Sequence, residues 1–108
     1  MTAKPQNDPV LKRFRDAVVE IYCERLERVV LFGSRARGDA QRDSDYDVAV
    51  FLRDMTNRDA EMNRLADPAT DVLYNDGQFI HAMPYRARCY NDERMPLMHE
   101  ICAEGIDL

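Results

Sequence analysis

Two aspartates, Asp45 and Asp47, stand at the start of the apolar run YDVAVFL, where a strand is expected to enter a core. Residues two positions apart in a strand share one face and lie about 6.6 Å apart along it, so the two carboxylates can converge on one hard cation. A buried carboxylate is costly unless it is paired, hydrogen-bonded or bound to a metal. We therefore predict that magnesium and the phosphates of a substrate neutralise the pair.

Gly33 and Ser34 follow the apolar run RVVLF and predict a phosphate-binding turn. A glycine has no Cβ and lets the backbone approach a ligand closely, and a serine at the beginning of a helix places its hydroxyl beside free amide groups. Arg35 and Arg37 can add charge-assisted hydrogen bonds to a triphosphate or can be solvated on an exposed helix, and the sequence leaves both roles open. Arg42 adds to this local basic cluster.

The composition is that of an ordinary globular domain, with 108 residues, of which 45% are apolar and 32% charged. Because a chain of this length holds one modest core, we predict a single domain over residues 1–108. The net charge of −5 argues against nucleic acid as a direct ligand, since binding to a phosphate backbone needs a cationic face. Arg25 and Arg28 are expected to be solvated surface charges.

The cysteines and the N-terminal residues indicate the cellular location of the protein. Cys23, Cys89 and Cys102 are odd in number and lack the spacing of a metal site, which is typical of reduced thiols in the cytosol. The first ten residues have no apolar signal core, and no run approaches the roughly 20 apolar residues of a membrane span. We predict a cytoplasmic protein that does not act at a membrane.

Hydrophobic periodicity predicts helices and strands in alternation. Apolar residues recur at helical spacing from Val10 to Tyr22, with Asp8 as the N-cap and Pro9 in the first turn. The segment 28–34 holds a strand that stops at Gly33, and further strands are predicted at 46–52 and 78–85. Helices are predicted at 35–40, 56–75 and 96–104, and the last of them ends at Gly105. This order predicts an α/β or α+β sheet with helices packed on it.

Two prolines refine this prediction. Pro68 interrupts the helix after the second strand, which Thr56 is expected to cap and Gly77 to end, so a kink or a second helix starting at an Asp67 cap is expected. Pro84 lies in the third strand. Because proline cannot donate a ladder hydrogen bond, it places the far end of that strand at a sheet edge or exit.

The segment GSRARGDAQRDSDYDVAV resembles the minimal branch, the MNT proteins, of the nucleotidyltransferase superfamily that is built like DNA polymerase beta. The pattern joins Gly33-Ser34, the run 36–39, Ser44-Asp45 and Asp47, and the order of the elements around it also fits. The Gly-Lys-Ser or Gly-Lys-Thr ending of a Walker loop and the three spaced glycines of a dinucleotide fingerprint are both absent from the sequence.

The resemblance implies a mixed β-sheet with flanking helices that binds Mg²⁺ and ATP and transfers a nucleoside monophosphate. On this basis, Gly33, Ser34 and Arg37 bind the nucleotide, and Asp45 and Asp47 bind the metal and carry the catalysis. MNT proteins of this size often act as antitoxins of HEPN-domain ribonuclease toxins, in some cases by placing AMP on a toxin tyrosine. The expected partner is therefore a HEPN-domain toxin, in a hetero-oligomer, and a homo-oligomer is the other assembly considered.

One departure from the family concerns a third carboxylate, which the superfamily usually supplies from a later strand to bind the metal and activate the attacking hydroxyl. The strand QFIHAMPY holds no acid, and His81 occupies the corresponding place. An imidazole can accept a proton near neutral pH but is a poor magnesium ligand, and a half-buried structural histidine is the more common case. Asp71 and Asp76 are expected to be surface and turn residues rather than substitutes.

Three functions remain open from the sequence. The first is an enzyme that passes AMP from Mg-ATP to a partner protein. The second is a catalytically weak or inactive antitoxin that neutralises its toxin by binding, which the absence of a third acid favours and the retention of Asp45 and Asp47 disfavours. Transfer to a small molecule such as an antibiotic is the weakest of the three, because the chain has no room for an acceptor domain.

Overall fold

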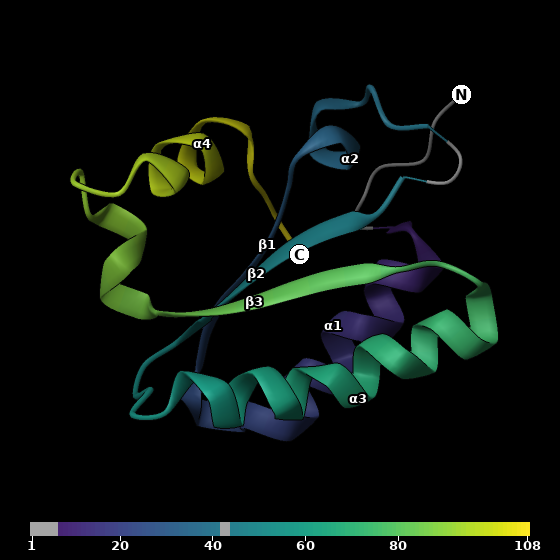
Figure 1. Ribbon diagram of the computed structural model, residues 1–108, viewed down its shortest axis with the longest axis horizontal. Coiled ribbons are helices and arrows are strands. Elements are labelled where there is room, and N and C mark those ends of the chain that lie inside the picture. Colours follow the sequence, from purple (N-terminus) through teal and green to yellow (C-terminus); the bar gives the residue numbers. More distant parts are fainter. Residues whose placement is uncertain (1–6, 42–43) are drawn as a thin grey trace.

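The computed structural model describes residues 7–41 and 44–108, which form a four-stranded sheet with helices on both faces (Figure 1). The elements are α1 (Pro9–Tyr22), β1 (Leu26–Phe32), α2 (Ser34–Arg37), β2 (Tyr46–Leu52), α3 (Arg58–Asp76), β3 (Ile80–Arg86), α4 (Pro96–Glu104) and β4 (Ile106–Asp107), with short 3-10 helices η2 (Cys23–Arg25) and η3 (Ala87–Asn91). None of the helices in these two ranges is long and apolar enough to cross a membrane.

The strands of the sheet lie in the order β3-β2-β1-β4. β1 pairs antiparallel with β2 and with β4, whereas β2 pairs in parallel with β3. α1 and α3 cover one face of this sheet, and α4 with η3 covers the other (Figure 1). The prediction of a mixed sheet with flanking helices, in the α/β or α+β class, is therefore confirmed.

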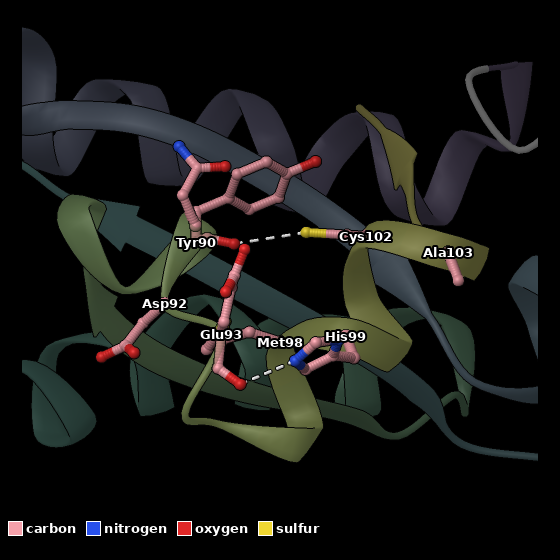
Figure 2. A pocket seen from close by; sticks show the side chains of 8 residues that line it. Tyr90, Asp92, Glu93, Met98, His99, Cys102 and Ala103 are labelled. Atoms are coloured by element: carbon pink, nitrogen blue, oxygen red, sulfur yellow. Dashed lines mark hydrogen bonds between the residues drawn. The ribbon is translucent and has the colours of Figure 1, made fainter.

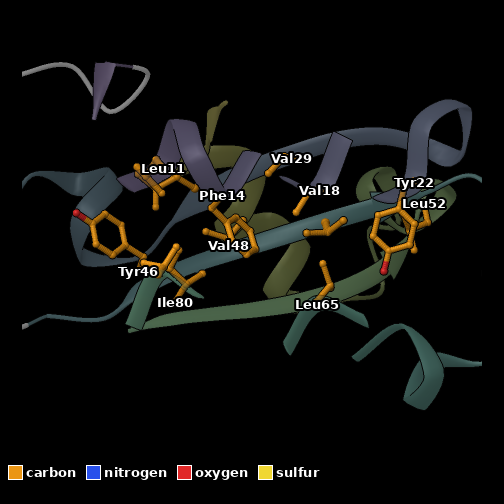
Figure 3. Close-up of a cluster of buried hydrophobic side chains, with 13 residues drawn as sticks. Leu11, Phe14, Val18, Tyr22, Val29, Tyr46, Val48, Leu52, Leu65 and Ile80 are labelled. Carbon is orange, nitrogen blue, oxygen red and sulfur yellow. The ribbon is translucent and has the colours of Figure 1, made fainter. Parts of the chain in front are cut away.

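β2 is the central strand that positions the candidate site, and its side chains alternate between two hydrophobic clusters. Tyr46, Val48 and Leu52 lie in the cluster with α1 and α3 (Figure 3), and Val50 belongs to the same cluster. Ala49 and Phe51 face α4 and η3. Asp47 has the parity of the second set, so its carboxylate lies on the α4 side of the sheet, where 34% of the side chain is exposed.

α1 begins where the sequence predicts. Its N-cap is Asp8, whose Oδ1 accepts a hydrogen bond from the Val10 amide at 2.9 Å, and Pro9 lies in the first turn. Oδ2 of Asp8 accepts a second hydrogen bond, from the Tyr46 hydroxyl at 2.8 Å. One capping carboxylate therefore also ties the start of α1 to the start of β2.

α3 differs from the prediction at its beginning and at its proline. Asn57, rather than Thr56, caps the helix by accepting a hydrogen bond from a first-turn amide at 3.1 Å. Of the two alternatives expected at Pro68, a second helix starting at Asp67 is wrong, because α3 continues as one helix through Pro68, whereas a kink stays a prediction. The Pro68 ring is buried, and the free energy gained by this burial offsets part of the cost of the backbone hydrogen bond that a proline removes. Gly77 ends the helix in a left-handed conformation, as predicted.

Two short elements were not predicted correctly. β4 pairs with β1 through its two residues only, and two residues carry no period that a sequence can show. The helix predicted at 35–40 ends earlier, since Gly38 has a φ of 85° and its amide donates to the Ser34 carbonyl. The third strand lies at the edge of the sheet, as Pro84 predicts, and β2 and α4 have the predicted bounds.

The sequence predicts that Arg25 and Arg28 are solvated surface charges, but in the structure both side chains contact other residues. Arg25 donates to Glu61, a carboxylate of which only 4% is exposed, and to Asp54 at 2.8 Å. The guanidinium of Arg28 lies 4.0 Å from the ring centre of Tyr90. Both side chains lie at the surface, with 35% of Arg25 and 37% of Arg28 exposed, but the sequence does not reveal their partners, which come from distant parts of the chain.

Tyrosine ionisation is expected to destabilise this fold at alkaline pH. Burial, followed by the charge of Glu61, raises the pKa of Tyr22 to about 12, and burial, followed by the hydrogen bond to Asp8, raises the pKa of Tyr46 to about 12. Both folded pKa values lie above the unfolded value of about 10. The resulting stabilisation is therefore fully present below a pH of about 10 and is lost as the pH rises towards about 12.

Denaturant titrations over this alkaline range measure the effect as a fall in the free energy of unfolding. Tyr22→Phe and Tyr46→Phe should each make that fall less steep. Tyr74→Phe is the control, because Tyr74 is 84% exposed, and it should leave the fall unchanged. A pH dependence that is the same in wild type and in both buried-tyrosine variants would show that other groups cause it.

Candidate active site

The turn between β1 and α2 is shaped by Gly33, which lies against Asp47. Gly33 has φ 77° and ψ −157°, a backbone region that is open almost only to glycine. A Cβ at this position would lie 2.5 Å from Oδ2 of Asp47, well inside van der Waals contact. Phe32 pairs with Asp47 across β1 and β2, so the antiparallel register brings the turn and the carboxylate together.

An open cavity of about 460 Å³ lies over this turn, on the α4 side of the sheet. It is lined by Gly33, Ser34, Arg37, Asp47 and His81, and by Phe32, Met83, Tyr85, Leu97 and Glu100. Its volume falls in the range of about 300–1,000 Å³ that is usual for small-molecule sites. The sequence gives no signal for Leu97 and Glu100, because they reach the site through the packing of α4 rather than through any motif.

Asp47 and His81 are direct neighbours on the parallel strands β2 and β3. Nδ1 of His81 lies 3.6 Å from Oδ1 of Asp47. His81 therefore stands beside Asp47, as the strand pattern predicts. Its side chain is 58% exposed, which is more than the half-buried histidine that we expect from the sequence, because β3 is an edge strand.

Asp45 lies immediately before β2 and is exposed. Tyr46, which separates it from Asp47, is buried on the opposite face of the sheet, so the predicted alternation of side chains is present. Asp45 does not line the cavity that contains Asp47 and His81. The convergence of Asp45 and Asp47 on one cation stays a prediction.

Arg37 lines the cavity and is held there by acidic side chains. It forms ion pairs with Asp39 at 3.3 Å and with Glu104 at 3.0 Å, and Glu100 lies 3.9 Å away. Hydrogen bonds to Asp39 and then to Glu104 raise the pKa of Arg37. The guanidinium is therefore charged and positioned at the cavity, and a phosphate would have to compete with these carboxylates for it.

Arg35 does not line the cavity as Arg37 does, although the sequence leaves the same two roles, phosphate binding and solvation, open for both. Its guanidinium donates to the Ser44 carbonyl at 2.7 Å and lies 4.0 Å from the ring centre of Tyr46. These contacts fasten the loop before β2 to α2, so Arg35 supports the site rather than lining its cavity. Arg42, the third member of the predicted basic cluster, lies outside the described residues.

Within residues 7–41 and 44–108, no group of three acidic, histidine or cysteine side chains is arranged to hold a metal. Asp71 is exposed on α3, and Asp76 pairs with Arg13, so neither supplies a third carboxylate. The two predicted aspartates still fit magnesium, which often takes one or two carboxylates and completes its shell with water and substrate phosphates. The missing Cβ of Gly33 makes room for the Asp47 carboxylate beside the turn, and the open cavity over the turn has space for such phosphates.

Another cavity, of about 450 Å³, lies between η3 and α4 (Figure 2). There Nε2 of His99 lies 2.7 Å from the carbonyl oxygen of Glu93, and Sγ of Cys102 donates to the Tyr90 carbonyl at 3.2 Å. Both side chains are thus engaged with the local backbone. None of the predicted site residues lines this cavity, so the candidate active site is the one at Asp47.

A family described as nucleotidyltransferase domain matches residues 11–94 of the chain. This chain belongs to that nucleotidyltransferase family. The matched range contains the Gly33 turn, both aspartates and His81, and so includes the whole candidate site except its α4 wall.

Two proteins of Methanocaldococcus jannaschii that are named as inferred protein adenylyltransferases are similar to this nucleotidyltransferase in sequence. One is 41% identical over 46 residues, which cover 43% of this chain and 46% of the relative. The first match thus spans less than half the length of that relative. The other protein is 29% identical over 84 residues, which cover 78% of each chain.

Solved structures of toxin–antitoxin complexes contain a similar fold. A toxin–antitoxin complex with AMP-PNP matches with a TM-score of 0.61 and 18% identity, over 87% of this chain and 68% of the other. The complex of a tri-AMPylated Shewanella oneidensis HEPN toxin with an MNT antitoxin matches with a TM-score of 0.54 and 15% identity, over 91% and 70% of the chains. The chain therefore has the minimal nucleotidyltransferase fold that its motif resembles.

Proposed function

We propose that this nucleotidyltransferase transfers AMP from Mg-ATP to a hydroxyl of a partner protein and serves as the antitoxin of a HEPN/MNT toxin–antitoxin pair. One observation carries the proposal: Asp47, at the start of the central strand, lies against the Gly33 turn in an open cavity with Ser34 and Arg37. The names of the two relatives and the toxin–antitoxin complexes of similar fold support the choice of acceptor and partner.

Each predicted site residue has a part in this proposal. Gly33 and Ser34 bind the triphosphate at the turn, and Asp45 and Asp47 hold the accompanying magnesium. A bound magnesium ion supplies neutralisation of the phosphate charge. Arg37 exchanges an ion pair with an acidic side chain for a charge-assisted hydrogen bond to a phosphate oxygen.

The proposed reaction is an in-line displacement at the α-phosphorus. A bond forms between the acceptor oxygen and the α-phosphorus, and the bond from the α-phosphorus to the oxygen that bridges to the β-phosphorus breaks. Pyrophosphate leaves, and the proton of the acceptor hydroxyl passes to a base or to solvent. The cavity is open and Asp47 is partly exposed, so a side chain of a second protein can reach the site.

The proposed setting follows from the same features. We expect residues 1–108 to act as a single domain in the cytoplasm. The expected partner of this domain is a HEPN-domain toxin. The net charge of −5 favours a protein or nucleotide ligand over direct contact with nucleic acid.

Transfer of labelled AMP tests the proposal. The purified protein is mixed with the protein encoded by its neighbouring gene, with Mg²⁺ and with ATP labelled at the α-phosphate. We expect label on the partner, none after EDTA removes the cation, and none with ATP labelled at the γ-phosphate, because that phosphate leaves in pyrophosphate. A partner that stays unlabelled while its toxicity is neutralised would rule out AMP transfer.

A second candidate function is neutralisation of the toxin by contact alone. The observation in its favour is that the described residues hold no group of three side chains arranged for a metal. This function predicts a complex whose dissociation constant is the same with and without Mg-ATP. Calorimetry of the two proteins under both conditions distinguishes it from the enzyme.

A further inference from the structure

His81 has no assigned part in the proposed reaction, although it lies beside Asp47. We propose that its imidazole is a direct ligand of the cation that accompanies the nucleotide, so that the site selects a divalent transition-metal ion such as Mn²⁺ over Mg²⁺. The inference rests on the proposed function, because both need Asp47 to bind the cation.

The sheet places the two donor side chains together. β2 and β3 run in parallel with Asp47 opposite His81, and cross-strand partners point to the same face of a sheet. Nδ1 of His81 lies 3.6 Å from Oδ1 of Asp47. Two donors with bonds of about 2.1 Å to one cation lie about 3.0–3.4 Å apart. A small side-chain adjustment therefore brings both donors to one ion.

The His81 ring is available for a ligand. It lines the same cavity as Asp47, Gly33 and Ser34, and 58% of the side chain is exposed. Its separation from Asp47 exceeds the roughly 2.7–3.2 Å of a hydrogen bond, so the carboxylate does not lock the ring in place. The strand that carries it has one neighbour in the sheet, which leaves room for the ring to turn towards the cation.

Imidazole at this place changes which cation the site prefers. Mg²⁺ is a hard cation that favours oxygen donors, whereas transition-metal ions of the first row bind imidazole nitrogen more readily. Mn²⁺ also accepts the carboxylate and phosphate oxygens that the proposed site provides. An imidazole beside Asp47 therefore favours Mn²⁺ over Mg²⁺ more than a carboxylate at the position of His81 would.

Mn²⁺ binding, measured by electron paramagnetic resonance, tests the inference without any transfer reaction. AMP-PNP is present as the nucleotide, and Mg²⁺ is titrated as the competitor. His81→Ala is expected to weaken Mn²⁺ binding by about tenfold or more and to change Mg²⁺ binding much less. His81→Asp should raise the Mg²⁺ affinity relative to the Mn²⁺ affinity. A pulsed measurement should detect an imidazole nitrogen coupled to Mn²⁺ in the wild type and lose it in both variants.

His99→Ala is the matched control, because His99 is the other histidine of the chain and its Nε2 lies against a backbone carbonyl in a different cavity. It should leave the Mn²⁺ affinity and the nitrogen coupling unchanged. Circular dichroism should show the same folded spectrum for all histidine variants, since both side chains are exposed.

Two results would overturn the inference: no nitrogen coupling in the wild type, or equal Mn²⁺ affinities in the wild type and His81→Ala. Asp47→Asn separates this failure from a failure of the proposed function. If Asp47→Asn loses cation binding and His81→Ala does not, only the histidine ligand is rejected. If neither variant loses cation binding, the proposed cation site is rejected with it.

Discussion

Asp47→Asn is expected to lower the rate of AMP transfer by about 1,000-fold or more, which corresponds to about 4 kcal/mol of transition-state stabilisation. Asparagine keeps the shape of aspartate and can lie against Gly33, but it lacks the charge that holds a divalent cation. The free energy of unfolding should change little, because the side chain is partly exposed and stands at the edge of the core. Transfer from α-labelled ATP and urea denaturation measure the two effects separately.

Asp71→Asn is the control for this change, since it removes the same charge from an exposed position on α3 and should transfer AMP at the wild-type rate. Asp45→Asn should reduce transfer as Asp47→Asn does, because the proposal assigns both carboxylates to one cation. Transfer by Asp47→Asn at the wild-type rate would contradict the proposed site. Neutralisation of the toxin by an Asp47→Asn protein that labels nothing would instead favour masking by contact.

Gly33→Ala is expected to reduce AMP transfer by about 100-fold or more, because it displaces a catalytic side chain. The new Cβ would lie 2.5 Å from Oδ2 of Asp47, and this oxygen is at the free end of a side chain that can swing away. The clash is therefore relieved by moving the carboxylate off the phosphate turn. The glycine-only backbone conformation adds a loss of about 1–3 kcal/mol in the free energy of unfolding.

Gly38→Ala separates the displaced carboxylate from backbone strain. Gly38 also has a positive φ, of 85°, but a Cβ there would meet nothing within 4 Å. We expect a stability loss of about 1–2 kcal/mol from the left-handed conformation, with AMP-PNP binding and transfer retained. Calorimetry with Mg²⁺ and AMP-PNP, together with urea denaturation, measures both quantities. Equal loss of transfer in the two alanine variants would show that strain, and not Asp47, accounts for the result.

Most elements of the fold could be predicted because neighbouring residues decide them. β2 is apolar at every position after Asp47, α1 has an aspartate cap before a proline, and α4 begins with a proline and ends before a glycine. The errors lie where local signals are weak or compete. Thr56 and Asn57 are adjacent candidate caps, of which asparagine is the stronger. α3 also runs through the buried Pro68, where the sequence favoured an interruption.

The roles of the arginines could not be predicted, because they depend on contacts between distant residues. Arg35 and Arg37 are two positions apart on one short helix, yet one stacks on Tyr46 and the other lines the cavity beside Glu104. Arg25 looks like a surface charge in the sequence but pairs with buried Glu61.

The sequence by itself determined which residue types the candidate site contains. These are a glycine–serine turn, two aspartates two positions apart at the start of an apolar strand, and a histidine where an acid was expected. Only the tertiary structure decided that Gly33 touches Asp47, that His81 stands 3.6 Å from it, and that α4 adds Glu100 to the cavity. The physical reason is that strand register and helix packing bring together residues from β1, β2, β3 and α4, whereas spacing along the chain reports only on neighbours within one element.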